Sequence, residues 1–201
     1  MGPHSVKAPA ERPERAWRAR AAPALVIAGA LVVHVAALRA EGRRWWCACG
    51  RPTPWVSDAW GPHNSQHLFD PYSFTHVLHG LLLCGLLAWA FPRLGWRWRL
   101  CLAVCAEVAW EMFENSQFVI DRYRAAAALG YEGDTVANSL GDVLSCAAGF
   151  LLARRLGVRG SVALFLATEA VLLLWVRDSL LLNVVMLIHP IDAIKAWQAV
   201  H

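Results

Sequence analysis

Three sets of polar side chains lie inside apolar stretches of this sequence, where such groups are costly. The sets are Glu107, Glu111 and Glu114; Asp134, Asn138 and Asp142; and His76 with His79. Their spacings of three, four, seven or eight residues place the members of each set on one face of a helix, at about 100° per residue. Carboxylates and imidazoles at membrane depth are stable only where they face a protein interior or water, so these positions are candidates for a functional site.

The depth of these residues indicates that the three faces meet. Glu111 and Glu114 lie within roughly 15 Å of the outer end of an apolar stretch over residues 100–120, at about 1.5 Å per residue. The other two sets occupy the first turns of stretches that enter from the same side. We therefore expect an outward-facing cavity lined by His, Glu and Asp. Glu107 and Glu169 are expected to lie deeper, as structural partners of the cavity or of each other.

The chemistry of such a cavity requires a compensating charge. Clustered carboxylates repel one another and lose solvation, and a divalent metal such as zinc would neutralise them through ordinary nitrogen and oxygen ligands. The predicted metal ligands are His76, His79, Asp134, Asn138 and His67, and the predicted catalytic groups are Glu111, Glu114 and Asp142. Shared protons, or Arg122, Arg124 and Arg177 at the outer edge, are alternative compensators. For any single acid, helix capping in a small bundle is the simpler explanation.

A second set of metal-ligand residue types lies in a loop further towards the N-terminus. Cys47 and Cys49 are followed by His63 and His67. This C-x-C…H-x-x-x-H pattern approaches a two-Cys, two-His zinc site, although one residue between the cysteines is tighter than the usual two to four. A disulfide is the competing outcome in an oxidising compartment, but a bridge between residues two apart is strained.

The elements that must position these residues are apolar helices. The chain of 201 residues is 57% hydrophobic and 17% charged, whereas soluble domains are about 45–50% apolar and about 25% charged. A helix needs about 20 residues to cross a bilayer. The stretches near that length are 23–38, 74–91, 100–120, 136–152, and 156 or 161 to 176.

We therefore predict an all-α polytopic membrane bundle of about five transmembrane helices. Residues 1–20 are predicted to form a disordered basic tail, and residues 21–201 a single integral membrane domain with outer loops 39–73 and 121–133. The apolar run 180–188 is too short to span and is predicted to be an interfacial or half-inserted segment.

The distribution of cations predicts the orientation. The short connections 93–99 and 154–159 each carry three arginines and no acid, which favours a cytoplasmic N-terminus. The net charge of +4 is too small and too scattered to indicate nucleic-acid binding. The expected partners are the lipid bilayer and a lipid or envelope substrate, while the sequence does not identify a protein partner.

A short internal repeat accompanies this organisation. Residues 64–72 and 115–123 share Asn-Ser-Gln, three mostly apolar residues, Asp, any residue and Tyr. The parallel fits two related helical hairpins plus a fifth span. The alternative is that Asn, Ser and Asp only cap helices and form turns at an interface.

Seven motifs together resemble uncharacterised protein family 0314, also catalogued as domain of unknown function 2585. The motifs are residues 47–50, 64–67, 73–80, 110–116, 122–124, 133–139 and 183–190. The resemblance implies a multi-pass bacterial inner-membrane protein with no assigned function, and so it bears on topology rather than chemistry. One departure is His63, which stands where the family pattern has an acid, and this places His63 in doubt as a ligand.

Three functions are compatible with these features. The first is a metal-dependent enzyme acting on a lipid or envelope intermediate at the outer leaflet, with a spare carboxylate as general base. The second is a non-enzymatic assembly or resistance factor that binds a partner protein or a lipid headgroup. The third is a proton-coupled transporter that uses Glu107, Glu111, Asp142 and Glu169 as a relay, although no polar path leads to the cytoplasmic side.

Overall fold

The computed structural model describes residues 13–126 and 130–199, which form seven helices and no strand beyond one isolated bridge between Trp55 and Phe69. The helices are α1 (Pro13–Ala40), α2 (Ser73–Ala90), α3 (Trp96–Glu114), α4 (Gln117–Ala126), α5 (Val136–Trp175), α6 (Leu180–Ile188) and α7 (Asp192–Gln198). The prediction of an all-α fold is confirmed for this part of the chain.

Three of these helices are long and apolar enough to cross a membrane. They are the segment Ala21–Ala40 of α1, all of α2, and α5. Helix α3 is less apolar, because three glutamates and two arginines interrupt its sequence. The five-span topology therefore stays a prediction.

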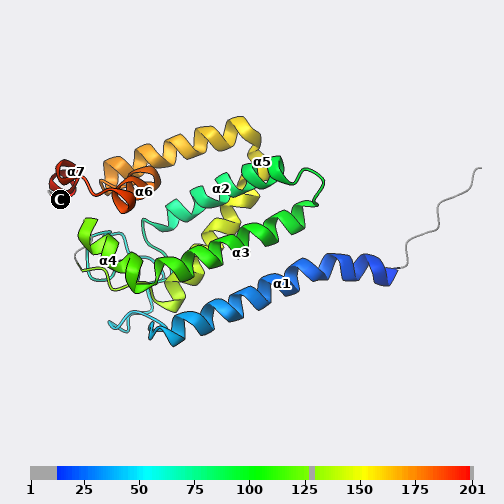
Figure 1. Ribbon diagram of the computed structural model, residues 1–201, viewed down its shortest axis with the longest axis horizontal. Helices are drawn as coiled ribbons and strands as arrows, with labels where there is room; N and C mark the ends of the chain where they lie inside the picture. The colour runs from blue at the N-terminus through cyan, green and yellow to red at the C-terminus, as the bar shows by residue number, and fades with distance from the viewer. Residues whose placement is uncertain (1–12, 127–129, 200–201) are drawn as a thin grey trace, which may run out of the picture.

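Helix α5 contains a sharp bend at Gly157. This residue has φ 68° and ψ −176°, a conformation that is essentially restricted to glycine. Figure 1 shows the chain turning back at the bend, so that the second arm of α5 runs in the opposite general direction to the first. The bend separates the two stretches 136–152 and 161–176 that the sequence predicted as different spans.

Helices α2 and α5 pack with almost no space between their backbones. A Cβ atom at Gly80 of α2 would collide with the carbonyl oxygen of Cys146, and one at Gly149 of α5 would collide with that of Val77. Small residues allow such close approach of membrane helices. This contact sets the depth at which the polar residues of the two helices face one another.

Helix α3 lies between α2 and α1 in Figure 1 and also contacts α5, which completes the bundle. Val104 and Val108 of α3 pack with Val143 of α5, and Ile27 and Leu31 of α1 cover the same cluster. The valine side of α3 therefore faces the core formed with α1 and α5.

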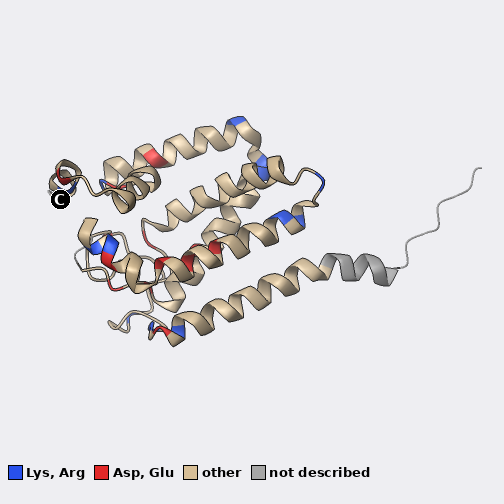
Figure 2. Cartoon of the chain, viewed as in Figure 1, with Lys and Arg blue, Asp and Glu red and all other residues tan. Residues whose placement is uncertain are grey.

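The basic connections lie close together, as the orientation prediction requires. The guanidinium of Arg154, just before the bend of α5, lies 3.9 Å from the ring centre of Trp96 at the start of α3. Figure 2 shows Lys and Arg at the α2–α3 connection and at the α5 bend, and most acids towards the opposite ends of these helices. The location of these ends in the cytoplasm stays a prediction.

Several predicted boundaries change. Helix α1 begins at Pro13, so residues 13–20 are helical rather than part of a disordered tail, and residues 1–12 lie outside the described residues. Helix α3 ends at Glu114 instead of continuing to residue 120, because the side chain of Asn115 turns to bond Asp134. Helix α4 occupies part of the predicted loop 121–133, of which residues 127–129 are not described. The two copies of the Asn-Ser-Gln repeat also differ locally, since the first lies in irregular chain and the second leads into α4.

Replacing Gly80 by alanine is expected to destabilise the bundle by about 1–3 kcal/mol, because the added methyl group overpacks the α2–α5 contact. Thermal unfolding of the detergent-purified protein measures the effect. The matched control is Gly85→Ala on the same helix, where a Cβ atom meets nothing within 4 Å and where alanine favours helix by up to about 1 kcal/mol. Equal melting temperatures for the two variants would contradict the proposed close packing.

Candidate functional site

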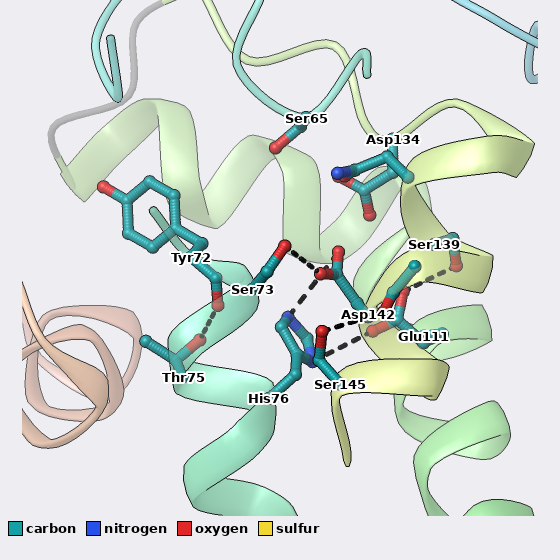
Figure 3. Close-up of polar contacts among 12 residues, drawn as sticks. Ser65, Tyr72, Ser73, Thr75, His76, Glu111, Asp134, Ser139, Asp142 and Ser145 are labelled. Carbon is teal, nitrogen blue, oxygen red and sulfur yellow. Dashed lines mark hydrogen bonds and ion pairs between the residues drawn. The ribbon is translucent and has the colours of Figure 1, made fainter. Parts of the chain in front are cut away.

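The polar side chains of α2, α3 and the first arm of α5 converge near the start of α2, the end of α3 and the start of α5. Figure 3 shows His76 of α2 between Glu111 of α3 and Asp142 of α5. His76 is 6% exposed, Glu111 0% and Asp142 4%. We call the group formed by His76, His79, Glu107, Glu111 and Asp142 the His/Glu/Asp cluster.

Glu107 is the residue through which the two histidines are joined. Its Oε1 lies 2.6 Å from Nδ1 of His76 and 3.0 Å from Nδ1 of His79, and its Oε2 lies 3.1 Å from the same nitrogen of His79. The two histidines are neighbours on α2, with ring centres 5.0 Å apart. The Glu107 carboxylate therefore contacts the Nδ1 atoms of both histidines in the interior of the bundle.

Glu111 has one engaged and one open carboxylate oxygen. Oε2 accepts a 2.6 Å hydrogen bond from Ser139, whose hydroxyl also lies 2.9 Å from Nε2 of His34. Oε1 lies 3.2 Å from Nδ1 of His76 but has no hydrogen-bond partner among the described residues. An open acceptor in a fully buried position can take up a proton or a cation.

Asp142 is held at the opposite edge of His76. Its Oδ1 accepts a 2.8 Å hydrogen bond from Ser73, and its Oδ2 lies 3.9 Å from Nε2 of His76 (Figure 3). Ser73 also accepts a bond from the backbone nitrogen of Asp70. The first turn of α2 thus fixes the position of Asp142.

A second polar layer lies above the cluster and closes the ends of the helices. Asp70 accepts bonds from the backbone nitrogens of Ser65 and Tyr72 and from the side-chain amide of Asn138. These contacts hold the start of α2 against α5. The side chain of Asn138 is therefore used for helix positioning.

Asp134 belongs to the same upper layer. Its two oxygens accept bonds from Asn115 at 2.7 Å and from the hydroxyl of Tyr131 at 2.9 Å, and its backbone nitrogen donates to Asn115. Burial, reinforced by the charges of Glu114 and Asp70, raises the pKa of Asp134 to about 7 in spite of these bonds.

Within residues 13–126 and 130–199, three sets of residues have ligand atoms close enough to share one metal ion, all within 4.8 Å of one another in each set. The sets are His76, His79 and Glu107; His76, Glu111 and Glu114; and, in the loop, Cys47, Cys49, His63 and His67. The first two share His76 and belong to the His/Glu/Asp cluster or its edge.

Comparison with known sequences places the whole cluster inside one family. The family described as "Protein of unknown function (DUF2585)" matches residues 38–200. The chain belongs to this family. The matched region includes every member of the His/Glu/Asp cluster, whereas His34 lies before it.

Curated relatives, described as UPF0314 proteins, align with most of this chain. A UPF0314 protein of Rhizobium meliloti is 45% identical over 176 residues, which are 87% of this chain and 89% of the relative. A UPF0314 protein of Paracoccus denitrificans is 44% identical over 159 residues, 79% of this chain and 82% of the relative. A UPF0314 protein of Sphingopyxis alaskensis is 43% identical over 176 residues, which are 87% of this chain and 94% of the relative. The resemblance to family 0314 is confirmed, and no solved structure matches the chain.

The structure brings together only part of the predicted site of this DUF2585 protein. His76, His79, Glu111 and Asp142 lie in one cluster, and Glu114 lies at its edge, where it accepts a 2.8 Å bond from Tyr123. Asp134 and Asn138 are engaged with amides and hydroxyls of the upper layer, and His67 lies in the separate loop group. Four members of the cluster are buried and His79 is partly exposed, and the predicted outward-facing cavity stays a prediction.

Residues outside the predicted site complete the arrangement. Glu107, predicted to be a deeper structural partner, contacts both histidines. Its position on the same helix face as Glu111 is the sequence feature that could have indicated this role. The carboxylate of Glu169 instead accepts hydrogen bonds from the first two backbone nitrogens of α6. The predicted compensating arginines, Arg122, Arg124 and Arg177, each donate to backbone carbonyls. The described basic side chains that face the acids of the cluster are therefore the imidazoles of His76 and His79.

The raised pKa of Asp134 makes stability depend on pH. The folded protein holds this proton up to about pH 7, while the unfolded chain releases it near 3.8, so the contribution is full below about pH 4 and is lost as pH rises through 7. We expect the melting temperature to fall between about pH 5 and pH 8, and Asp134→Asn to flatten this dependence.

Thermal unfolding at several pH values checks this expectation. The control is Asp121→Asn, because Asp121 is exposed and bonds only Gln117 of its own helix among the described residues. Parallel pH profiles for the wild type and Asp134→Asn would contradict the assignment.

Proposed function

We propose that this protein is a polytopic inner-membrane metalloenzyme that hydrolyses a lipid or lipid-linked envelope intermediate. His76, His79 and Glu107 would hold the metal, and Glu111 would act as general base. The single observation that carries the proposal is the convergence of two imidazole Nδ1 atoms on one buried carboxylate, with a second, partly unpartnered carboxylate beside them.

The donor set supports a catalytic rather than a structural metal. Two histidines and one carboxylate form a common set for catalytic zinc and for related transition metals, with further positions left for water or substrate. The nitrogens and oxygens of His76, His79 and Glu107 already lie within 4.8 Å of one another. A cation placed among them would replace the protons that the imidazoles now share with Glu107.

Glu111 is suited to proton transfer. Ser139 and His76 hold its carboxylate beside the donor set, and Oε1 is free of hydrogen bonds within the described part of the chain. In the proposed reaction Glu111 takes a proton from the attacking water, whose oxygen forms the new bond. The same proton then passes to the leaving group as the bond to it breaks.

The exposed edge of the cluster indicates the class of substrate. His79 is its most accessible member, with 19% of the side chain exposed, and lies edge-on to Trp110 at 5.9 Å. Trp110 in turn packs against Phe113, which is 48% exposed. A substrate approaching along this aromatic surface from the bilayer would reach His79 first, which favours a lipid.

A second candidate function is proton transfer along the cluster. Hydrogen bonds and close contacts connect His79, Glu107, His76, Glu111, Ser139 and His34 in series. However, His34 is 0% exposed, so this series ends inside the bundle. Proton flux into proteoliposomes driven by a pH gradient would favour this candidate over the metalloenzyme.

Metal analysis tests the ligand set directly. Glu107→Gln and His79→Ala are each expected to lower the metal content by one equivalent per chain, with affinity reduced by more than the roughly 10–100-fold that loss of an outer-shell partner costs. Inductively coupled plasma mass spectrometry of the detergent-purified protein gives the stoichiometry. Glu132→Gln and His189→Ala are matched controls, because both residues are exposed. Wild-type metal content in Glu107→Gln and His79→Ala would overturn the ligand assignment.

Activity tests the role of Glu111 separately from metal binding. Glu111→Gln is expected to keep the metal but to lower hydrolysis by about 10²–10⁴-fold, because the amide cannot accept the proton. The purified protein is incubated with a total lipid extract of the native envelope, and products are followed by mass spectrometry. Glu132→Gln again serves as the control, and undiminished product formation by Glu111→Gln would exclude Glu111 as the base.

A further inference from the structure

The long connection between α1 and α2 covers the beginning of α5 without forming a helix or a strand of its own. Three backbone hydrogen bonds join the two. They are Val136 N to Arg44 O at 2.8 Å, Ala137 N to Trp45 O at 3.2 Å, and Thr135 N to Ser65 O at 3.0 Å. One piece of this connection, residues 44–45, therefore satisfies the first two backbone nitrogens of α5, which have no partner within the helix, and a second piece, residue 65, holds the N-cap residue Thr135.

The same two pieces of chain carry four side chains of metal-ligand type. Cys47 and Cys49 follow the first piece, and His63 and His67 flank the second. The Sγ of Cys47 lies 3.3 Å from Nδ1 of His63, and the Sγ of Cys49 lies 3.5 Å from Nε2 of His67. All four donor atoms lie within 4.8 Å of one another, and both cysteines are free.

These separations are those of a tetrahedral zinc site. With Zn–S bonds of about 2.3 Å and Zn–N bonds of about 2.0–2.1 Å, sulfur and nitrogen ligands lie about 3.5 Å apart. The two sulfur-to-nitrogen distances, 3.3 and 3.5 Å, match this value without movement of the chain. The narrow C-x-C spacing therefore does not prevent the four donors from gathering.

The tautomer of His67 also fits a ligand. Its Nδ1 lies 2.6 Å from the carbonyl oxygen of Thr53. A carbonyl can only accept, so Nδ1 must carry the proton, and the lone pair of Nε2 then faces Cys49. Histidine ligands of zinc are commonly oriented by such a bond from the other ring nitrogen.

The surroundings give the group the character of a structural site. Cys47 and His67 are buried, the backbone nitrogen of Cys49 donates to Sγ of Cys47 at 3.4 Å, and Trp46 packs edge-on against His67 at 5.5 Å between ring centres. Four protein donors complete a tetrahedral zinc shell and leave no position for substrate. Soft thiolate ligands select zinc over magnesium or calcium.

We propose that Cys47, Cys49, His63 and His67 bind one zinc ion that clamps the α1–α2 connection over the N-terminal end of α5. The site is separate from the His/Glu/Asp cluster and does not depend on its proposed catalytic role. By holding residues 44–45 and 65 in place, the zinc would fix the position of the first turn of α5. It would thereby also fix the residues of the upper polar layer.

Cobalt substitution of the full-length, detergent-purified protein tests the proposal. Cobalt bound by cysteine thiolates gives an intense near-ultraviolet charge-transfer absorption that a site of histidines and carboxylates lacks. We expect this absorption in the wild type and its loss in Cys49→Ser and in His67→Ala, together with loss of one zinc equivalent. Cys105→Ser is the matched control, because Cys105 lies in α3 away from the loop and should leave both signals unchanged.

Two further measurements keep the result decisive if a variant folds poorly. Treatment of the wild type with a strong zinc chelator is expected to lower its melting temperature and to abolish the charge-transfer absorption, and added zinc should restore the melting temperature. His79→Ala should keep the absorption, which distinguishes this site from the His/Glu/Asp cluster. A Cys47–Cys49 disulfide in the intact mass of the purified protein, or an unchanged zinc content in Cys49→Ser and His67→Ala, would overturn the proposal.

Discussion

The buried carboxylate of Glu107, and its compensation by His76 and His79, is the interaction on which the polar interior of this bundle depends. An isolated carboxylate in an apolar interior is unstable, and here two imidazole nitrogens at 2.6 and 3.0 Å from one oxygen offset its charge. Because these histidines lie on α2 and the glutamate on α3, the pairing also fixes how the two helices face each other. Glu111 and Asp142 then lie around the same histidine from α3 and α5.

The acids of this DUF2585 protein are divided between two layers with different roles. In the upper layer Asp70 and Asp134 accept bonds from backbone nitrogens, amides and hydroxyls, which seat the ends of α2, α3 and α5. In the lower layer the acids face imidazoles, and one oxygen of Glu111 remains open among the described residues. Carboxylates whose oxygens are all hydrogen-bonded are suited to positioning helices, whereas a buried carboxylate oxygen without a hydrogen bond can take up a proton or a cation. The lower layer is therefore the better candidate for catalysis.

The two groups of metal-ligand residues differ in the same way. The loop group offers four donors, including two thiolates, on chain without regular structure, and a metal there would replace the packing that such a connection lacks. The His/Glu/Asp cluster offers two imidazoles and a carboxylate on helices, with a second carboxylate alongside. A closed shell stabilises a fold, while an incomplete shell leaves room for water and substrate.

Local periodicity predicted the long apolar helices and the stripes of polar residues, but it did not predict α4. Helix α2 was expected at 74–91 and lies at Ser73–Ala90, and the short α6 lies at 180–188 as predicted. The depth at which one helix meets another is not local. The contacts of Gly80 and Gly149 set the register of α2 against α5, and they place Asp142, rather than Asp134 or Asn138, beside His76. The bend at Gly157 and the turn of Asn115 towards Asp134 likewise depend on partners distant in the chain, so only the tertiary structure could reveal them.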